Sequence, residues 1–182
     1  ILQNQIEKFG RNLFKEGSMV IPGNIAYDSE YTCVQIDDSH LGLPVSLYID
    51  SLVGALIQGE KSGVKAKVEN YITAEDSDLN SYTLYIKYQS SGTDNTTTKF
   101  VDGENLIALQ DISYSDSSIK SGNSFATTIL SNSTSIGSAA KIGEGVFFIR
   151  GFFVSVSQQT VILDQYNNLP SYRVGLLIDE EI

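Results

Sequence analysis

Apolar residues recur at helical spacing at the start of the chain. Four of them share one face of a predicted helix, at intervals of four, three and four positions: Leu2, Ile6, Phe9 and Leu13. Gly10 lowers the helix propensity of this segment, and Glu16-Gly17 predicts its end. The stripe fits two arrangements: packing on the β core of the same chain, or a coiled coil with other subunits, for which only about two heptads are present. The spacing alone does not choose between them.

From residue 18 to residue 112, apolar and polar residues alternate with a period of two, which predicts β-strands. The expected strands are Ser18–Ile21, Tyr31–Ile36, Val45–Ile49, Leu52–Ile57, Val64–Glu69, Tyr82–Tyr88, Lys99–Val101 and Leu106–Leu109. Turn signals such as Pro22-Gly23 separate them. Short strands at close spacing predict a small antiparallel barrel or sandwich over Tyr31–Ile112.

A serine-rich segment, Ser113–Ser138, follows these strands and is interpreted as a linker or a long loop. Its apolar stretch Phe125–Leu130 predicts that part of it is ordered. We therefore expect a mainly β protein in three parts. A short helix over residues 1–16 serves docking or oligomerisation, a barrel-like insertion spans residues 31–112, and a second β unit combines residues 17–30 with residues 113–182.

The densest apolar run is Val146–Val156. On an extended chain both of its faces are largely apolar, which is typical of a strand covered on both sides. Arg150 and Gly151 interrupt the run and predict a bulge or a close backbone approach. Thr160–Leu163 and Tyr172–Ile178 predict two further strands, so the C-terminal part is expected to be a meander.

This C-terminal stretch, GVFFIRGFFVSVSQQTVILDQYNNLPSYRVGLLIDEEI, resembles a family of domains of unknown function in virion proteins of contractile-tailed phages, cyanophages in particular. The matching pieces are Gly145–Val154, Gln159–Tyr166 and Pro170–Ile182. Phe14–Gly23 resembles the glycine turn that opens these domains. Tyr31–Ile107 matches only as a pattern of strands. The pairing of FFIRG with a YRVGL strand carries most of the specificity.

The resemblance implies a structural piece of a tail, baseplate or fibre-attachment protein that acts by assembly. The partners it implies are other tail and baseplate proteins and further copies of the chain. It implies a location in the virion tail, after assembly in the host cytoplasm. The family has no catalytic motif to transfer, so the resemblance assigns no catalytic, cofactor-binding or metal-binding residue.

Composition narrows the classes of partner. The chain has 182 residues, enough for one domain or two small ones, and a net charge of −10, which disfavours binding to nucleic acid. It contains no apolar run of the ~20 residues that a membrane-spanning helix needs. Cys33 is the single cysteine, so neither an internal disulfide nor a cysteine zinc site is expected. Because the chain starts at Ile1 without Met and ends directly after a strand, we expect a fragment of a longer protein.

Two polar loops carry candidate chemistry. His40 follows Asp37-Asp38, which suggests a metal ligand or general base, but a solvated turn explains the same residues. Asp76, Asp78 and Asn80 have the spacing that opens a calcium loop, although the glycine and distant glutamate of that motif are missing. Neither loop yields an assigned site.

Catalytic motifs are otherwise lacking. His40 is the only possible imidazole base, and the sequence has neither a G-x-S-x-G elbow nor a phosphate-binding glycine loop. We therefore predict no enzyme and no cofactor. The alternative to an assembly role is a carbohydrate- or receptor-binding module of a tail fibre. Its binding loops would be Glu75–Asn80 and Ser90–Thr98, and Tyr82, Tyr85 and Tyr88 lie on the strand between them, with at least one ring available for contact.

Overall fold

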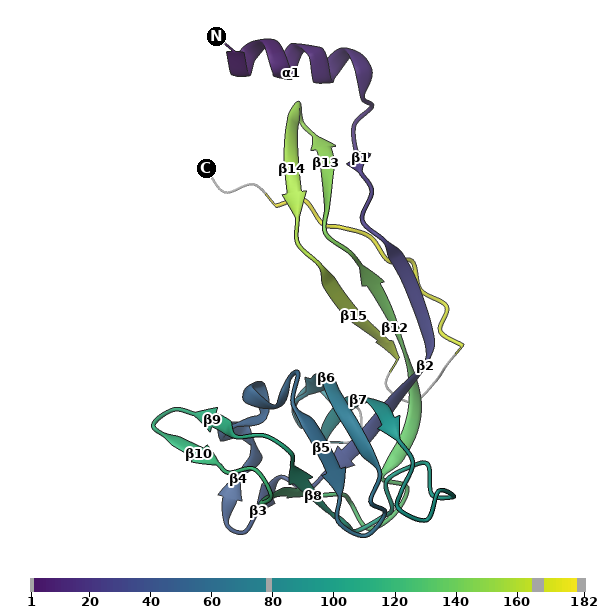
Figure 1. Cartoon of the computed structure of the whole chain (residues 1–182). Coiled ribbons are helices and arrows are strands. Elements are labelled where there is room, and N and C mark those ends of the chain that lie inside the picture. The colour runs from purple at the N-terminus through teal and green to yellow at the C-terminus, as the bar shows by residue number, and fades with distance from the viewer. Residues whose placement is uncertain (1, 78–79, 165–168, 180–182) are drawn as a thin grey trace. The chain divides into compact units, whose positions relative to one another are not determined.

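The chain folds into antiparallel β-sheets with one helix at its N-terminus, so the prediction of a mainly β protein with a short N-terminal helix is confirmed (Figure 1). The computed structural model describes residues 2–77, 80–164 and 169–179. It divides the chain into two compact units. The central unit is Glu30–Gly137, and the terminal unit comprises Ile1–Ser29, Ser138–Asp164 and Leu169–Ile182. The central unit thus extends past Ile112, the predicted end of the insertion.

The central unit is built from short strands that mostly pair with neighbours in one sheet. Its elements are β2 (Ile25–Ile36), β3 (Ser39–His40), β4 (Leu43–Pro44), the 3-10 helices η1 (Val45–Leu47) and η2 (Ile49–Leu52), β5 (Leu56–Gly59), β6 (Lys65–Ile72), β7 (Tyr82–Ser90), β8 (Asn105–Ala108), β9 (Ile112–Tyr114), β10 (Ser117–Ile119) and β11 (Ser124–Thr127). The largest sheet has the order β11-β8-β5-β6-β7-β2-β12-β15, where β12 is Thr134–Ile142 and β15 is Gln159–Asp164. The strand order is open, with β11 and β15 at its two ends, so the sheet is no closed barrel and agrees with the sandwich alternative.

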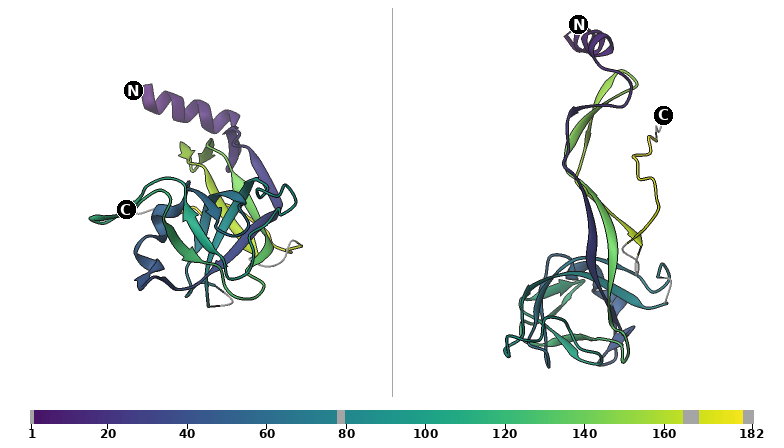
Figure 2. Two further views of the ribbon diagram at one scale, coloured as in Figure 1. Left: turned by 60° about the horizontal axis from the view of Figure 1, so that its bottom comes forward. Right: turned by 90° about the vertical axis from the view of Figure 1, so that its right-hand side faces the viewer.

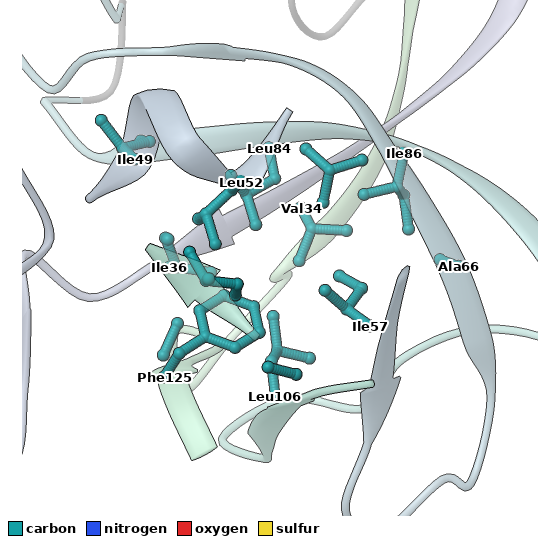
Figure 3. Packing of buried hydrophobic residues seen from close by; sticks show 14 of the residues in the cluster. Val34, Ile36, Ile49, Leu52, Ile57, Ala66, Leu84, Ile86, Leu106 and Phe125 are labelled. Carbon is teal, nitrogen blue, oxygen red and sulfur yellow. The ribbon is translucent and has the colours of Figure 1, made fainter. Parts of the chain in front are cut away.

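The core of the central unit lies where the inward residues of these strands meet. Figure 3 shows Val34, Ile57, Leu84, Leu106 and Phe125 pointing into one space, and all five are buried. Burying a side chain of this size contributes about 1.5–3 kcal/mol. In β6 the apolar residues point inward and the lysines outward, which confirms the alternation predicted for this strand.

Two segments predicted as strands have another structure. Over Val45–Leu52 the chain forms η1 and η2 in place of strand, because its buried residues recur every three or four positions rather than every two: Val45, Tyr48, Ile49 and Leu52. Of the predicted strand Leu52–Ile57, only the end belongs to β5. The predicted return strand Lys99–Val101 is also wrong, since Phe100 instead inserts its ring against Tyr88 at a centroid distance of 5.3 Å.

The serine-rich segment is no linker. Its strand β11 pairs with β8, and Phe125 and Ala126 on β11 belong to the buried core. The hydroxyl of Tyr48 donates a hydrogen bond to the carbonyl oxygen of Phe125, which fixes β11 against the 3-10 helices. The expectation that its apolar stretch is ordered is confirmed.

The terminal unit contains α1 (Leu2–Leu13), the only α-helix among the described residues, and a three-stranded sheet. That sheet has the order β1-β13-β14, with β1 at Ser18–Ile21, β13 at Gly145–Ile149 and β14 at Phe152–Val156 (Figures 1 and 2). The predicted strand at residues 18–21 is therefore confirmed. The predicted strand Thr160–Leu163 also exists, as β15, paired with β12.

The apolar run Val146–Val156 is a hairpin, so the predicted bulge at Arg150-Gly151 is wrong. Phe148 pairs with Phe153 across the two strands, and Ile149 pairs with Phe152. Arg150 and Gly151 form the turn with φ angles of +50° and +90°. Two positive φ angles are typical of the tight turns that match the twist of a hairpin, and glycine adopts such an angle without strain.

Replacing Gly151 by alanine should destabilise the hairpin by about 1–2 kcal/mol, because a side chain at positive φ is strained. A Cβ atom there would also lie 2.6 Å from Nε of Arg11. Faster amide hydrogen exchange within β13 and β14 would report the loss. Gly175→Ala is the matched control, since a Cβ atom at that position meets nothing within 4 Å. Equal exchange in both variants would contradict the turn's role.

The predicted strand Tyr172–Ile178 is wrong for the single chain. Residues 169–179 form a segment without assigned secondary structure, and within the described part of the chain no strand pairs with it. Its large apolar side chains are exposed, Leu177 to 94%. The alternation that suggested a strand is present, but the described part of the chain provides no ladder partner for it.

Candidate functional site

Large apolar side chains gather on the surface of the terminal unit. Those exposed are Ile6, Phe9 and Leu13 on α1, Met19 and Ile21 on β1, Ile25 and Tyr27 on β2, Phe152, Phe153 and Val154 on β14, Val161 on β15, and Leu169, Tyr172, Val174, Leu176, Leu177 and Ile178 after it. Single exposed apolar residues are ordinary, but an accumulation of this kind is typical of a protein or membrane contact or of a ligand-binding groove. We take this set, called the apolar surface below, as the candidate functional site.

Helix α1 is held against the hairpin by one narrow face. Gly10 is buried, and a Cβ atom on it would lie 2.7 Å from the ring of Phe148, so only glycine permits this approach. The ring of Phe14 lies 5.9 Å from that of Phe148 and 5.8 Å from that of Phe153. The glycine that lowers helix propensity in the sequence is thus the point of closest packing.

Two backbone hydrogen bonds fix the end of α1 on the same hairpin. The amide of Gly17 donates to the carbonyl oxygen of Phe148 at 2.9 Å. The amide of Arg150, in the hairpin turn, donates to the carboxylate of Glu16 at 2.7 Å. These contacts, with the three phenylalanine rings, order the helix without using its apolar stripe.

Three residues of the apolar stripe of α1 are therefore left exposed. Ile6, Phe9 and Leu13 are exposed to 47%, 62% and 59%. Of the two arrangements that the spacing allowed, packing of these three side chains on the β core of the same chain is wrong. A coiled coil with other subunits stays a prediction.

The hairpin is covered on one strand only. Phe147 and Phe148 on β13 are buried, while Phe152, Phe153 and Val154 on β14 are exposed to 38–47%. The prediction of a run covered on both sides holds for β13 and is wrong for β14. Strand β14 is at the edge of its sheet, so it combines apolar side chains with unpaired backbone groups.

Two hollows continue the apolar surface between the strands and the C-terminal segment. The larger has a volume of about 450 Å³, and its lining includes Met19, Phe147, Val161, Val174 and Leu176. The smaller, of about 330 Å³, is lined by Phe152, Val154 and Leu177 among others. Their linings are mainly apolar. The charged residues among them are Lys141 in the larger hollow and Arg150 and Asp179 in the smaller one.

His40 is a buried structural residue, not part of a solvated turn. Its Nδ1 lies 3.0 Å from Oγ1 of Thr127 and its Nε2 lies 2.8 Å from Oγ of Ser124. Because the hydroxyl of Thr127 donates to Asn105, its oxygen accepts from the ring, which assigns the proton of the neutral ring to Nδ1. Asp37 and Asp38 are exposed, and no group of three or more His, Cys, Asp and Glu side chains in the described residues is placed to hold a metal.

The stability of the central unit should fall as the pH is lowered through the range of His40. Burial lowers the pKa of His40 below its ordinary value of 6.5, and Asp37 opposes this in part. The unfolded chain then binds the proton first, so the stabilisation is complete above about pH 6.5 and is lost as the pH falls towards the lower, folded pKa.

Urea unfolding between pH 5 and pH 8 tests this dependence. His40→Gln is expected to lose the dependence in this window, because His40 is the only histidine and carboxyl groups titrate mainly at lower pH. An equal pH dependence in both proteins would assign the effect to other groups.

Polar groups in the two loops proposed for ligand binding form hydrogen bonds with residues two or three positions away in the sequence. In Ser90–Thr98 the carboxylate of Asp94 accepts hydrogen bonds from the amides of Thr96 and Thr97 and from the hydroxyl of Thr97, which together lower the pKa of Asp94. In the acidic loop, Thr73 donates to Asp76 at 2.8 Å. Asp78, the second residue of the calcium-like spacing, lies outside the described residues.

The tyrosines of β7 pack into the central unit. Tyr85 is fully buried and stacks on Tyr31 at a centroid distance of 5.3 Å. Tyr82 and Tyr88 are half-buried against the core, and burial raises the pKa of Tyr88 to about 12. The expectation that at least one of these rings is free for contact with a ligand is wrong.

Comparison with protein-family models, with curated proteins and with solved structures gives no match for this chain. Among the described residues, no helix has the length and apolar character needed to cross a bilayer. The description of the apolar surface of the terminal unit therefore rests on the structure of this chain alone. The sequence patterns did not predict that the side chains of β14 are exposed. The signal for the hairpin was the Arg150-Gly151 pair between two apolar runs of equal length.

Proposed function

We propose that this chain is a structural component of a contractile phage tail, from a baseplate or fibre-attachment protein, and that it acts by subunit–subunit assembly. The observation that carries the proposal is the apolar surface of the terminal unit. Surfaces of this composition are stable in water when a partner covers them. The partners proposed are other tail or baseplate proteins and further copies of the chain.

The segments that resemble phage virion domains coincide with this surface. Gly145–Val154 covers β13 and the first part of β14, Gln159–Tyr166 includes β15, and Pro170–Ile182 includes the exposed C-terminal segment. The central unit, which resembles these domains only as a pattern of strands, buries its own core. The resemblance and most of the exposed large apolar side chains thus fall on the same unit, which supports assembly as the role of that unit.

A carbohydrate- or receptor-binding role is the weaker proposal. Sugar-binding surfaces commonly present an aromatic face, and the three tyrosines of β7 are buried or half-buried. The acidic and threonine-rich loops bond mainly within themselves. No contact in the described residues favours this role over assembly.

Immunogold electron microscopy tests the proposal. Antibodies raised against the central unit should label the tail end of particles of the phage that encodes the chain, and a capsid antibody provides the positional control. Antibody preadsorbed with the recombinant chain should leave the particles unlabelled. Label on the capsid alone, or none on intact or disrupted particles, would overturn the proposal.

A further inference from the structure

The exposed stripe of α1 has the geometry of a seam between identical helices. We propose that Ile6, Phe9 and Leu13, called the seam below, pack in parallel and in register against the same residues of a second copy of this chain. The inference rests on the proposed assembly function for the terminal unit and names the partner of one part of its surface.

The helix presents two separate faces, and its own chain uses only one of them. Gly10 and Phe14 pack on the hairpin, while the seam is exposed. In heptad notation Ile6 and Leu13 occupy a positions, and Leu2 and Phe9 occupy d positions, as in a coiled coil. Gly10 falls at e, which flanks the seam and is covered by the hairpin, and Phe14 falls at b, outside the seam. Ile6, Phe9 and Leu13 themselves stay exposed, so a second helix can reach them beside the hairpin.

The charge pattern suits a partner of identical sequence. In a parallel coiled coil each g position faces an e position of the neighbouring helix, and like charges there repel. The e and g positions of α1 are all uncharged: Gln3, Gln5, Gly10 and Asn12. The charged residues Glu7, Lys8 and Arg11 fall at b, c and f, away from the seam. Identical helices thus meet no repulsion, and these positions offer no charge that would select a different partner.

A short seam is sufficient here because the helix is already ordered. An isolated helix of 12 residues, the length of α1, is only marginally stable in water. In this chain the bonds of Gly17 and Glu16 to the hairpin, with the ring of Phe14, hold α1 in place before any copy arrives. Association therefore does not have to fold the helix, which lowers its cost in conformational entropy.

Solution mass measurements with charge variants test the seam. By sedimentation equilibrium the unmodified chain should have a mass of at least two copies. Phe9→Glu places a carboxylate from every copy in the seam and should weaken association at least a hundredfold, leaving monomers. Asn4→Glu adds the same charge at an f position and should keep the mass of the unmodified chain. Phe9 is exposed, so its replacement should leave the fold intact, which hydrogen exchange at Gly17 verifies.

Disulfide trapping tests orientation and register. In a parallel, in-register pair the d positions of the two helices approach each other, so Phe9→Cys should form a disulfide-linked dimer on mild oxidation. Asn4→Cys should not, and the unmodified chain, whose single Cys33 is buried, sets the background.

Three results would overturn the inference: a monomeric unmodified chain, an oligomer that Phe9→Glu leaves intact, or trapping that is equal at residues 4 and 9. These results are distinct from failure of the phage proposal. A monomer that still labels phage tails removes the seam alone, and a trapped dimer absent from tails removes the tail assignment alone.

Discussion

Replacing Glu104 by glutamine should lower the free energy of unfolding of the central unit by about 3 kcal/mol. The carboxylate is fully buried and accepts hydrogen bonds from the amides of Lys61, Ser62 and Val101 and from the hydroxyl of Ser62, at 2.7–3.0 Å. A glutamine has an NH₂ group in place of one of the two carboxylate oxygens. This group donates and cannot accept, so the donors that bonded to that oxygen lose their acceptor. Hydrogen bonds to a charged group contribute about 1.5–3 kcal/mol, and leaving buried donors unpaired costs a similar amount.

Urea unfolding followed by tyrosine fluorescence measures this loss, and Glu60→Gln is the matched control. Glu60 is exposed and accepts a hydrogen bond from the side chain of Asn105 at 2.8 Å, so the same substitution should change stability by less than about 0.5 kcal/mol. The difference between the two variants isolates burial, because both lie beside the turn that follows β5. If the two variants lose the same stability, the carboxylate of Glu104 does not organise this turn.

The sequence predicts strands well where polar residues mark the outward face. Lys65 and Lys67 alternate with Ala66 and Val68, and β6 follows that pattern. It fails over Val45–Leu52. There Ser46, Tyr48 and Asp50 alternate with Val45, Leu47 and Ile49 as in a strand, but the chain forms 3-10 turns and buries residues three or four positions apart.

The sequence showed the helical part of the candidate site as an amphipathic stripe. An amphipathic stripe indicates that the apolar face of the helix packs against something, but it does not identify the packing partner. The answer came from the contacts of Gly10 and Phe14 with Phe148, a residue from the other end of the chain, and no local pattern reveals such a contact. His40 follows the same logic, since its partners Ser124 and Thr127 lie more than 80 positions away. Hydrophobic periodicity and secondary-structure propensity are local properties, so they do not predict contacts between residues that lie far apart in the sequence.

Replacing Phe148 by alanine should release α1 from the hairpin. The side chain is 3% exposed, and its ring contacts those of Phe14 and Phe153 and the Cα face of Gly10. Removing a buried phenylalanine costs about 3–5 kcal/mol, and the low end applies here because Phe153 is partly exposed. A local loss of about 3 kcal/mol accelerates amide exchange by about a hundredfold. Hydrogen exchange at Gly17, whose amide donates to the carbonyl oxygen of Phe148, is the measurement.

Phe152→Ala is the matched control for this prediction. Phe152 lies on the same hairpin and pairs with Ile149, but it is 47% exposed, and the hairpin rings that contact Phe14 of the α1 end are those of Phe148 and Phe153. Its replacement should leave exchange at Gly17 nearly unchanged. The two variants also show whether self-association depends on α1 being held on the hairpin. Phe148 is buried and cannot contact a second copy itself, but Phe148→Ala should weaken self-association because α1, which carries the seam, is no longer fixed. If Phe148→Ala keeps both the protection of Gly17 and the oligomer mass, then α1 does not depend on the phenylalanine cluster, and the hairpin does not position the seam.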